Sequence, residues 1–509
     1  MNYTFDFLEN ELWWGGSSDY GDKMPLGSNS EYCHDFRVDA SNQTMPLFLS
    51  NKGRYIWSEN PFKVEIKDGK FCFDGEGIDI YNGGKNLKDA YTTAMKKHFP
   101  FSGKQLPEVF FKTAQYNTWI EFTYNPTQEK TMKYAEEIIE NGFEPGILII
   151  DEGWHGRYGE WDFNREKFPD PKGMIDKLHE MGFKVMLWVV PYVCADGESF
   201  IRKILAGEDV FMRTESGEVA IIKWWNGFSA ILNVSHKNDR EFLDKQLHYL
   251  MDEYGVDGFK FDGGDIASYQ PENVINGKLA CKMTAAELNI AWNEFGERYE
   301  FHEYKDTFKG GGKAVIQRLR DKYPTWDGIG INQLLPNTIL QGLIGHPFVC
   351  PDMIYGGDWG AFINGDPIDE ELFIRSAQCS ALLPMMQYSL LPWRVLSKEA
   401  LDIVIEAGKL HKKMADEIVA LVKESAVTGE PIVRHMEYQY PGSGYEMIND
   451  QFMLGNDILV APVVTQGTVE RDVVFPEGKW ADENGNTYEA GVHKVPSPLN
   501  VLPWFRKVK

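Results

Sequence analysis

Cysteine pairs, signal-peptide features and long apolar runs are all missing from this chain of 509 residues. Its six cysteines are scattered without a CxxC spacing, which argues against a disulfide framework or a zinc site and favours reduced thiols. The opening residues MNYTFDFLENELWWGG lack the basic stretch and the apolar run of a signal peptide. No stretch of about 20 apolar residues could cross a bilayer. We therefore expect a cytoplasmic protein with no membrane partner.

Positive charge is also scarce. The chain has 52 Lys and Arg against 76 Asp and Glu, a net charge of −24. So much negative charge would repel a nucleic-acid backbone or an anionic membrane, and neither is expected as a partner. HExxH, clustered metal ligands and a complete P-loop are absent, and Gly310–Lys313 reads as a plain turn. We expect no metal and no cofactor.

Aromatic residues, by contrast, make up 14% of the chain, with 15 Trp and 23 Tyr. Aromatic faces beside carboxylates suit sugar rings, although ordinary cores also use such residues. Residues 1–108 are expected to form an N-terminal β domain of sandwich type, because runs such as FKVEIKDGKFCFDG alternate around an Asp-Gly turn. Residues 428–509 return to short strand-like runs and are expected to form a C-terminal β domain.

The middle of the chain, residues 109–427, alternates apolar runs with amphipathic helices. Strand-like runs include 146–151, 183–190, 258–262, 299–304, 346–352 and 380–388, and helical spacing covers 171–181, 238–255, 284–298 and 397–425. Strands that alternate with helices predict a parallel sheet covered by helices. Their number favours a (β/α)8 TIM barrel, and no GxGxxG supports a Rossmann domain.

Three of these apolar runs end in an aspartate: Asp151, Asp262 and Asp352. One such residue alone could be a helix cap. In a TIM barrel, however, the carboxyl ends of the strands share one mouth, where active sites lie. Nearby tryptophans would lie beside these carboxylates: Trp154, Trp188, Trp224 and Trp225. Paired carboxylates ringed by aromatics are typical of a glycosidase.

Several segments resemble glycoside hydrolase family 31, a group of retaining α-glycosidases. They are IIDEGWHGRYGEWDFNREKFPDP with the strand that follows, GVDGFKFDGGD, DKYPTWDGIGINQLLPNTIL with HPFVCPDMIYGG, and GEPIVRHMEYQYPG with FMLGNDILVAPVV. The resemblance covers most of residues 109–485. It implies an exo-acting enzyme that uses a covalent glycosyl intermediate.

The resemblance places the catalytic nucleophile at Asp262 in KFDGGD. Lys260, two residues earlier on the same strand face, could supply a cation that keeps Asp262 ionised. Asp265 is the alternative to Asp262, but its position in a Gly-Gly turn favours local hydrogen bonds.

The acid/base position of the family, five residues before a Trp, matches Asp321 in DKYPTW. Asp327 in the Trp-Asp-Gly turn is the alternative. This group must be protonated at rest, so burial or the Asp262 charge should raise its pKa, whereas the neighbouring Lys322 would oppose this.

Further residues carry over as substrate binders: Asp151, Trp225 and Asp352, with Trp154 and Trp188 as either binders or core residues. The family's sugar-binding Arg, sixteen residues before the acid/base, corresponds here to Lys305. Lysine holds a hydroxyl as a point charge and lacks the planar fork of arginine. Arg318 could fill some of the same space.

The sugar is less defined. Ser389 or a neighbour stands where many α-glucosidases of the family have a His, and the DKxxxW and PDMIxGG forms look like the branch with α-galactosidases and the myogenesis-regulating type of glycosidase. We expect hydrolysis of a terminal α-linked hexose in an oligosaccharide or small α-glycoside, with α-galactoside first. An α-glucosidase, an α-xylosidase, a transglycosylase and a non-catalytic carbohydrate-binding homologue remain alternatives. A homo-oligomer formed through the β domains also stays open.

Overall fold

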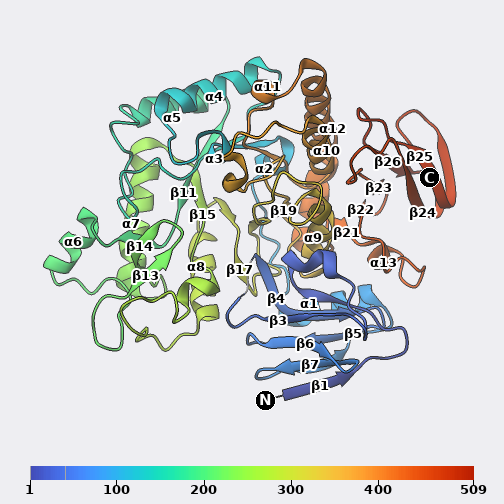
Figure 1. Ribbon diagram of the computed structural model, residues 1–509, viewed down its shortest axis with the longest axis horizontal. Coiled ribbons are helices and arrows are strands. Elements are labelled where there is room, and N and C mark those ends of the chain that lie inside the picture. The colour runs from blue at the N-terminus through green and yellow to red at the C-terminus, as the bar shows by residue number, and fades with distance from the viewer. Residues whose placement is uncertain (1, 40–41, 509) are drawn as a thin grey trace. The chain divides into compact units, whose positions relative to one another are not determined.

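A computed structural model describes residues 2–39 and 42–508 (Figure 1). The chain forms two compact units. The first contains residues 1–34, 45–115 and 311–509, and the second contains residues 35–44 and 116–310. The domain boundaries expected near residues 108 and 427 stay predictions.

The N-terminal strands form two sheets, blue in Figure 1. The first has the order β1 (Asn2–Asp6), β7 (Lys70–Asp74), β6 (Lys63–Lys67) and β3 (Cys33–Asp35). The expected hairpin is β6–β7, and its turn residues Asp68 and Gly69 both have positive φ, as a two-residue hairpin turn requires. The second sheet has the order β17 (Thr307–Phe308), β4 (Gln43–Ser50), β5 (Arg54–Trp57) and β8 (Asp79–Asn82), and β2 (Trp13–Ser17) pairs with β4.

Eight short strands form the sheet of the barrel. Their order is β19 (Val349–Cys350), β18 (Ile316–Arg318), β16 (Phe301–Tyr304), β15 (Gly258–Phe261), β11 (Lys184–Val189), β10 (Ile147–Ile150), β9 (Gln115–Asn117) and β20 (Gln387–Tyr388). The pairs β9–β10, β10–β11, β11–β15, β15–β16 and β18–β19 are parallel. Most of these residues are fully buried, which explains their continuous apolar runs.

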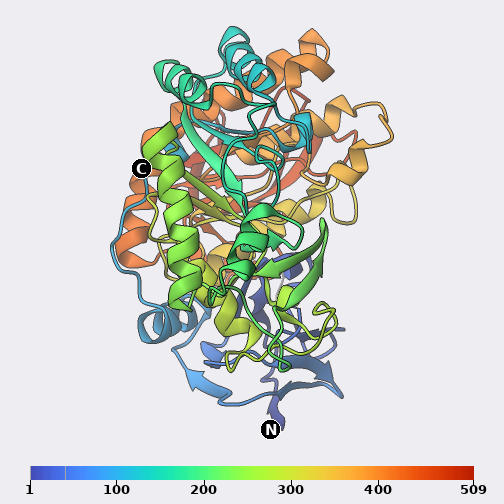
Figure 2. The same cartoon turned by 90° about the vertical axis from the view of Figure 1, so that its left-hand side faces the viewer.

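Several helices between the strands begin or end at well-formed caps. Asp170 caps α5 (Pro171–Glu180), a capping box starts α8 (Ala285–Gly296), and Gly255 in the left-handed conformation ends α7 (Lys237–Tyr254). Figure 2 shows α7 facing the viewer. The other helices and 3-10 turns are η1 (Ser18–Lys23), α1 (Leu87–His98), α2 (Val109–Lys112), α3 (Trp119–Phe122), α4 (Gln128–Glu140), η2 (Ile266–Tyr269), α9 (Ile331–Leu343), η3 (Trp359–Phe362), α11 (Pro392–Val395) and α13 (Met436–Gln439).

The strand expected over residues 380–388 is wrong in most of its length. Helix α10 (Glu370–Ala381) continues to Ala381, and only Gln387–Tyr388 forms a strand. Every residue of α10 from Leu372 onward is buried, including Arg375 and Gln378, which donate hydrogen bonds to the backbone of residues 497–499. Residues 382–386 form a buried turn and irregular backbone, whose apolar run is the same as that of a buried strand, and the pattern alone cannot separate them.

The expected long helix is α12 (Lys398–Thr428), which packs on α10 and α2. The C-terminal sheet, brown to red in Figure 1, has the order β21 (Val433–Arg434), β22 (Phe452–Leu454), β23 (Ile458–Val460), β26 (Trp504–Lys507), β24 (Glu470–Ala481) and β25 (Thr487–Pro496). Trp480 and Phe475 lie in its core.

The second unit also contains a small sheet in the order β12 (Tyr192–Cys194), β14 (Gly227–Ile231) and β13 (Ile221–Trp224), together with helix α6 (Glu198–Leu205). This sheet follows barrel strand β11 in the chain. None of the six cysteines forms a disulfide, and Cys350 and Cys379 are buried. In residues 2–39 and 42–508, none of the helices combines the length and the apolar character that a membrane span requires.

Candidate active site

Asp262 follows barrel strand β15 in the second unit and is surrounded by donors. Its Oδ2 accepts a hydrogen bond from Trp188 Nε1 at 3.0 Å, and its Oδ1 accepts one from the backbone N–H of Gly263 at 2.9 Å. Lys305 Nζ lies 3.9 Å from Oδ1. The side chain of Asp262 is 10% exposed. Donors and a cation favour the ionised carboxylate that a nucleophile needs.

Lys305 is thus a cation beside Asp262. Lys260, which could have supplied that cation, is bonded to a different carboxylate. Lys260 Nζ donates to Asp151 Oδ2 at 2.6 Å, and both side chains are less than 5% exposed. Lys260 lies on β15, and its partner Asp151 follows β10, which is two strands away in the sheet. Asp151 Oδ1 accepts the backbone N–H of Glu152 at 2.9 Å. Asp151 is thus a rigid, buried acceptor.

Two further buried carboxyls lie behind Asp262. Asp265 accepts hydrogen bonds from Ser268 and caps η2, which agrees with the local role expected for it. Asp306 accepts the backbone N–H of Asn42. Burial raises the pKa of Asp265, and burial together with the Asp265 charge raises the pKa of Asp306 to about 7. The raised pKa values of Asp265 and Asp306 favour their neutral forms and so limit the negative charge near Lys305 and Asp262.

The backbone of Lys305 is anchored by the first residues of β4. Gln43 Nε2 donates to the Lys305 carbonyl at 2.5 Å, and strand β17 pairs in parallel with Gln43 and Thr44. The position of Lys305 beside Asp262 therefore depends on residues 42–44. No sequence pattern indicated this contact, because the two segments are far apart in the chain.

The tryptophans differ in their roles. Trp154 is wholly buried, and its Nε1 donates to the Trp188 carbonyl at 2.9 Å, so it is a core residue. Trp188 is also buried but contacts Asp262 directly. Trp225 is 51% exposed at the turn of hairpin β13–β14, against Trp224 with ring centroids 4.9 Å apart. Of the expected binders Trp154, Trp188 and Trp225, Trp225 is the one whose ring is exposed to solvent.

Glu152 was missed by the sequence reasoning, although it forms an Asp-Glu pair with Asp151. It is 2% exposed, and burial with the nearby Asp151 and Asp262 charges raises its pKa to about 8. Tyr158 OH donates to its Oε1 at 2.5 Å, and Asn226 Nδ2 donates to the same atom. The sequence feature that could have identified Glu152 is the pair of consecutive acids at the end of a predicted strand.

In the first unit, Arg318 at the end of β18 brings two of the expected residues together. Arg318 Nη1 donates to Asp321 Oδ1 at 2.8 Å and to Asp352 Oδ1 at 2.6 Å. Asp352 Oδ2 accepts the backbone N–H of Lys322 at 2.7 Å. Burial raises the pKa of Asp352, and Arg318 opposes this rise. Arg318 thus interacts with both Asp321 and Asp352.

The same loop is tightly packed. Asp352 has a φ of 122°, a strained value for a residue with a side chain. A Cβ at Gly357 would lie 2.8 Å from Asp352 Oδ1 and 2.9 Å from Asp321 Oδ1, so glycine is needed there. The side chain of Asp321 is 28% exposed, enough to be reached from solvent. Strain and close packing of this kind are concentrated at functional sites.

Other expected residues in this unit lie apart from that cluster or are buried. Asp327 is exposed in a turn, where its carbonyl accepts a hydrogen bond from Thr325. Ser389 is fully buried after β20. Lys322 is 2% exposed, and burial lowers its pKa, which weakens the opposition expected from its charge. In the part of the chain that is described, no group of His, Cys, Asp and Glu could hold a metal ion.

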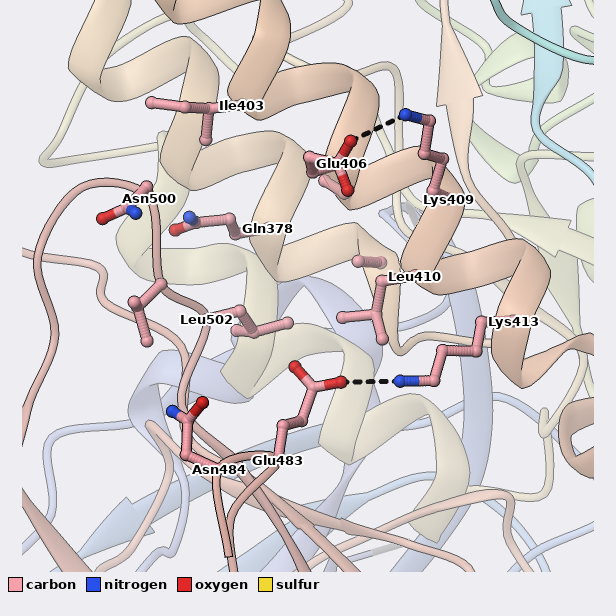
Figure 3. Close-up of a pocket in the computed structure, with 13 residues that line it drawn as sticks. Gln378, Ile403, Glu406, Lys409, Leu410, Lys413, Glu483, Asn484, Asn500 and Leu502 are labelled. Carbon is pink, nitrogen blue, oxygen red and sulfur yellow. Dashed lines mark hydrogen bonds and ion pairs between the residues drawn. The ribbon is translucent and has the colours of Figure 1, made fainter.

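A separate cavity of 430 Å³ opens in the first unit between α10, α12 and the loops at 483–484 and 500–502 (Figure 3). Its rim carries the ion pairs Lys413–Glu483 and Lys409–Glu406. It contains none of the expected site residues. The four charged groups of its rim are thus paired with one another.

Comparison with known proteins identifies the family and the fold. Residues 106–390 match the family model for the glycosyl hydrolases family 31 TIM-barrel domain, and residues 429–508 match the family 31 C-terminal domain. A family 31 dextranase of Flavobacterium johnsoniae, solved with glucose, has a TM-score of 0.85 at 20% identity and covers 99% of this chain and 66% of its own.

Two curated relatives are similar in sequence. Myogenesis-regulating glycosidase of Mus musculus is 28% identical over 429 residues, which are 82% of this chain and 58% of the relative. Alpha-glucosidase 2 of Bacillus thermoamyloliquefaciens is 24% identical over 528 residues, 96% of this chain and 64% of the relative. The chain therefore spans less than two thirds of these relatives' lengths. Its barrel and C-terminal domain show that the chain belongs to glycosyl hydrolase family 31, with the TIM-barrel fold expected from the sequence.

Proposed function

We propose that the chain is a retaining α-glycosidase that releases a terminal α-linked hexose, with Asp262 as nucleophile and Asp321 as acid/base. The observation that carries the proposal is the setting of Asp262. Trp188 Nε1, the Gly263 N–H and Lys305 Nζ all point at one carboxylate, which is 10% exposed at the end of a barrel strand. A carboxylate held in this way is ionised and aimed, as attack on a sugar carbon requires.

In the first step, Asp262 attacks the anomeric carbon while Asp321 protonates the leaving oxygen. This forms a covalent glycosyl-enzyme and releases the aglycone. In the second step Asp321, now ionised, takes a proton from water, which attacks the same carbon and frees the sugar with its α configuration retained. The contact with Arg318 would stabilise Asp321 while it is ionised between the two steps.

The binding residues fit a neutral sugar. Asp151, with both oxygens held by hydrogen bonds, would accept from a sugar hydroxyl, and the exposed ring of Trp225 would cover an apolar sugar face. Lys305 would donate to a hydroxyl near Asp262. For the sugar we put α-galactoside first, because the DKxxxW and PDMIxGG forms resemble that branch; α-glucoside and α-xyloside are the alternatives.

The catalytic assignment is tested by single substitutions assayed on p-nitrophenyl α-glycosides. We expect Asp262→Asn to lower kcat by about 10⁴-fold or more while the fold is kept, because the amide cannot form the intermediate. Asp321→Ala should slow substrates with poor leaving groups by about 10²–10⁴-fold and spare activated aryl glycosides in the first step. NMR of the first-formed product should show the α anomer.

Asp327→Ala is the matched control, because Asp327 is an exposed turn residue in the same segment. It should leave both classes of substrate unaffected. If Asp327→Ala instead produced the leaving-group dependence and Asp321→Ala did not, the acid/base role would pass to Asp327. Wild-type-like turnover by Asp262→Asn would rule out the nucleophile assignment. Sugar binding with no turnover of any glycoside would point to a non-catalytic homologue.

A panel of galactoside, glucoside and xyloside would identify the sugar. Sugar hydroxyls can replace water in the second step, so product analysis at high acceptor concentration separates hydrolysis from transfer. A predominance of transfer products would make the protein a transglycosylase with the same two carboxylates.

A further inference from the structure

Glu152 is a buried acid without a basic partner. It follows Asp151 at the end of β10, and its side-chain Oε1 accepts hydrogen bonds from Tyr158 OH at 2.5 Å and from Asn226 Nδ2. Both donors are neutral. An ionised carboxylate at 2% exposure would normally need a cation or several donors. The surroundings therefore suit the neutral carboxylic acid.

The charges around Glu152 lead to the same state. Asp151 and Asp262 lie close enough to raise its pKa, and the cation nearby, Lys260, is already bonded to Asp151. Burial is the larger cause, and together these effects bring the pKa of Glu152 to about 8. A third negative charge at this place would disturb the two aspartates, whereas a neutral acid adds only hydrogen bonds.

The two donors belong to the structure that holds Trp225. Asn226 is next to Trp225 in the turn that joins β13 to β14. Tyr158 packs edge-on against Trp224 with ring centroids 4.8 Å apart, and Trp224 packs on Trp225 at 4.9 Å. Glu152 thus connects the end of a barrel strand to both the turn and the aromatic stack of the hairpin.

The hairpin needs such a tie. The side chains of its turn region are exposed: Trp225 is 51% and Phe228 53% exposed. The base of the hairpin is held by the pairing of β14 with β12 and by the buried side chains of Ile222 and Ile231, so the contacts of its tip decide how the exposed turn is oriented. In β13, Trp224 Nε1 donates to Ser229 within the same hairpin and so does not fix it to the barrel. The Asn226–Glu152 hydrogen bond does.

We propose that Glu152 is a positioning residue that acts as a neutral carboxylic acid, ties Asn226 to the end of β10 and so holds Trp225 in place as the sugar-stacking wall. The sugar-stacking part rests on the proposed function, whereas the positioning of the hairpin does not. Since Glu152 acts through Asn226 and Tyr158, its loss should weaken substrate binding more than it slows chemistry.

The test compares Glu152→Ala with Glu152→Gln, which keeps a neutral acceptor of nearly the same shape. Glu166→Ala, at an exposed acid of the same segment, is the matched control. Hydrogen-exchange mass spectrometry should show residues 221–231 exchanging about tenfold faster in Glu152→Ala, as expected when a buried hydrogen-bond partner is lost. Glu152→Gln and Glu166→Ala should exchange like wild type. In kinetics, Glu152→Ala should raise KM about tenfold with a smaller change in kcat.

Asn226→Ala provides a second variant outside the buried cluster, in case Glu152→Ala does not fold. It should reproduce the faster exchange of residues 221–231. Unchanged exchange in both variants would overturn the positioning role. If Glu152→Gln were as impaired as Glu152→Ala, an ionised group would be required and the neutral-acid role would be wrong. If wild type turned over no glycoside, the proposed function would fail, while the exchange data would still decide the positioning role.

Discussion

Asp151 and Glu152 are consecutive buried acids, yet their neighbours give them different properties. Lys260 lies 2.6 Å from Asp151, whereas Glu152 receives hydrogen bonds from an amide and a phenol. A buried charge needs a partner of opposite sign, and a buried neutral acid needs only hydrogen bonds. At this scale each residue's chemistry follows from the two or three groups around it.

The Lys305 ammonium lies beside Asp262, and we expect it to stand where the family pattern has arginine. Its Nζ lies 3.9 Å from Asp262 Oδ1, a through-space contact without a fork. We expect Lys305→Met to lower kcat/KM about tenfold or more, because both a cation near Asp262 and a donor to the sugar are lost. Steady-state kinetics on the preferred aryl glycoside measure this.

Lys305→Arg is the matching control, since it keeps the charge and offers the family's guanidinium. It should retain more activity than Lys305→Met. Equal activity of wild type and Lys305→Met would show that this cation has no part in binding or catalysis.

At the scale of elements, the ends of helices and strands place the site. Helix α8 precedes β16, the strand that leads to Lys305. Its start is a capping box in which Thr284 Oγ1 accepts the Glu287 N–H at 3.2 Å, and Glu287 Oε2 accepts the Thr284 N–H at 2.7 Å. These bonds satisfy two groups at the helix terminus that otherwise have no partner.

Thr284→Ala should lower the free energy of unfolding by about 1 kcal/mol, the usual cost of a lost N-cap. Urea denaturation followed by circular dichroism measures the change. Thr284→Ser, which keeps the hydroxyl, should be close to wild type. An alanine variant as stable as the serine variant would mean that the capping box does not limit stability.

At the scale of the whole molecule, the formal net charge of −24 counts every acid as ionised, including the buried Glu152 and Asp306, whose pKa values are raised by burial. Burial raises the pKa of Glu152 to about 8, above its ordinary 4.5. Between these values the folded state binds more protons than the unfolded state, so this group's contribution to stability falls as pH rises. Below pH 4.5 it is protonated in both states, and this penalty is absent.

Glu152→Gln removes this titration. We expect the Tm difference between the variant and wild type to grow by about 2 °C or more in favour of the variant as the pH rises from 5 to 8. The reason is that wild type loses stability over this range, by about 1.4 kcal/mol for each unit of pKa shift. Calorimetry at several pH values measures the difference. Glu166→Gln should show no such trend. A constant difference between Glu152→Gln and wild type across this range would contradict the raised pKa.

Much of the architecture was predictable because it depends on local pattern. The β6–β7 hairpin was indicated by Asp68-Gly69, and α5, α7 and α8 by their helical spacing. The region 380–388 was not predictable, because a buried turn with irregular backbone, as at residues 382–386, has the same apolar run as a strand. The candidate carboxylates could be found because each ends or follows a short buried run.

By itself, the sequence determined the alternation of strands and helices, the acids at the strand ends and the family. The tertiary structure decided which cation lies beside which acid: Lys260 pairs with Asp151, Lys305 approaches Asp262, and Arg318 pairs with Asp321 and Asp352. It also revealed Glu152 and its bond to Asn226. The physical reason is that periodicity and capping act over a few residues, whereas ion pairs and burial depend on groups that only folding brings together.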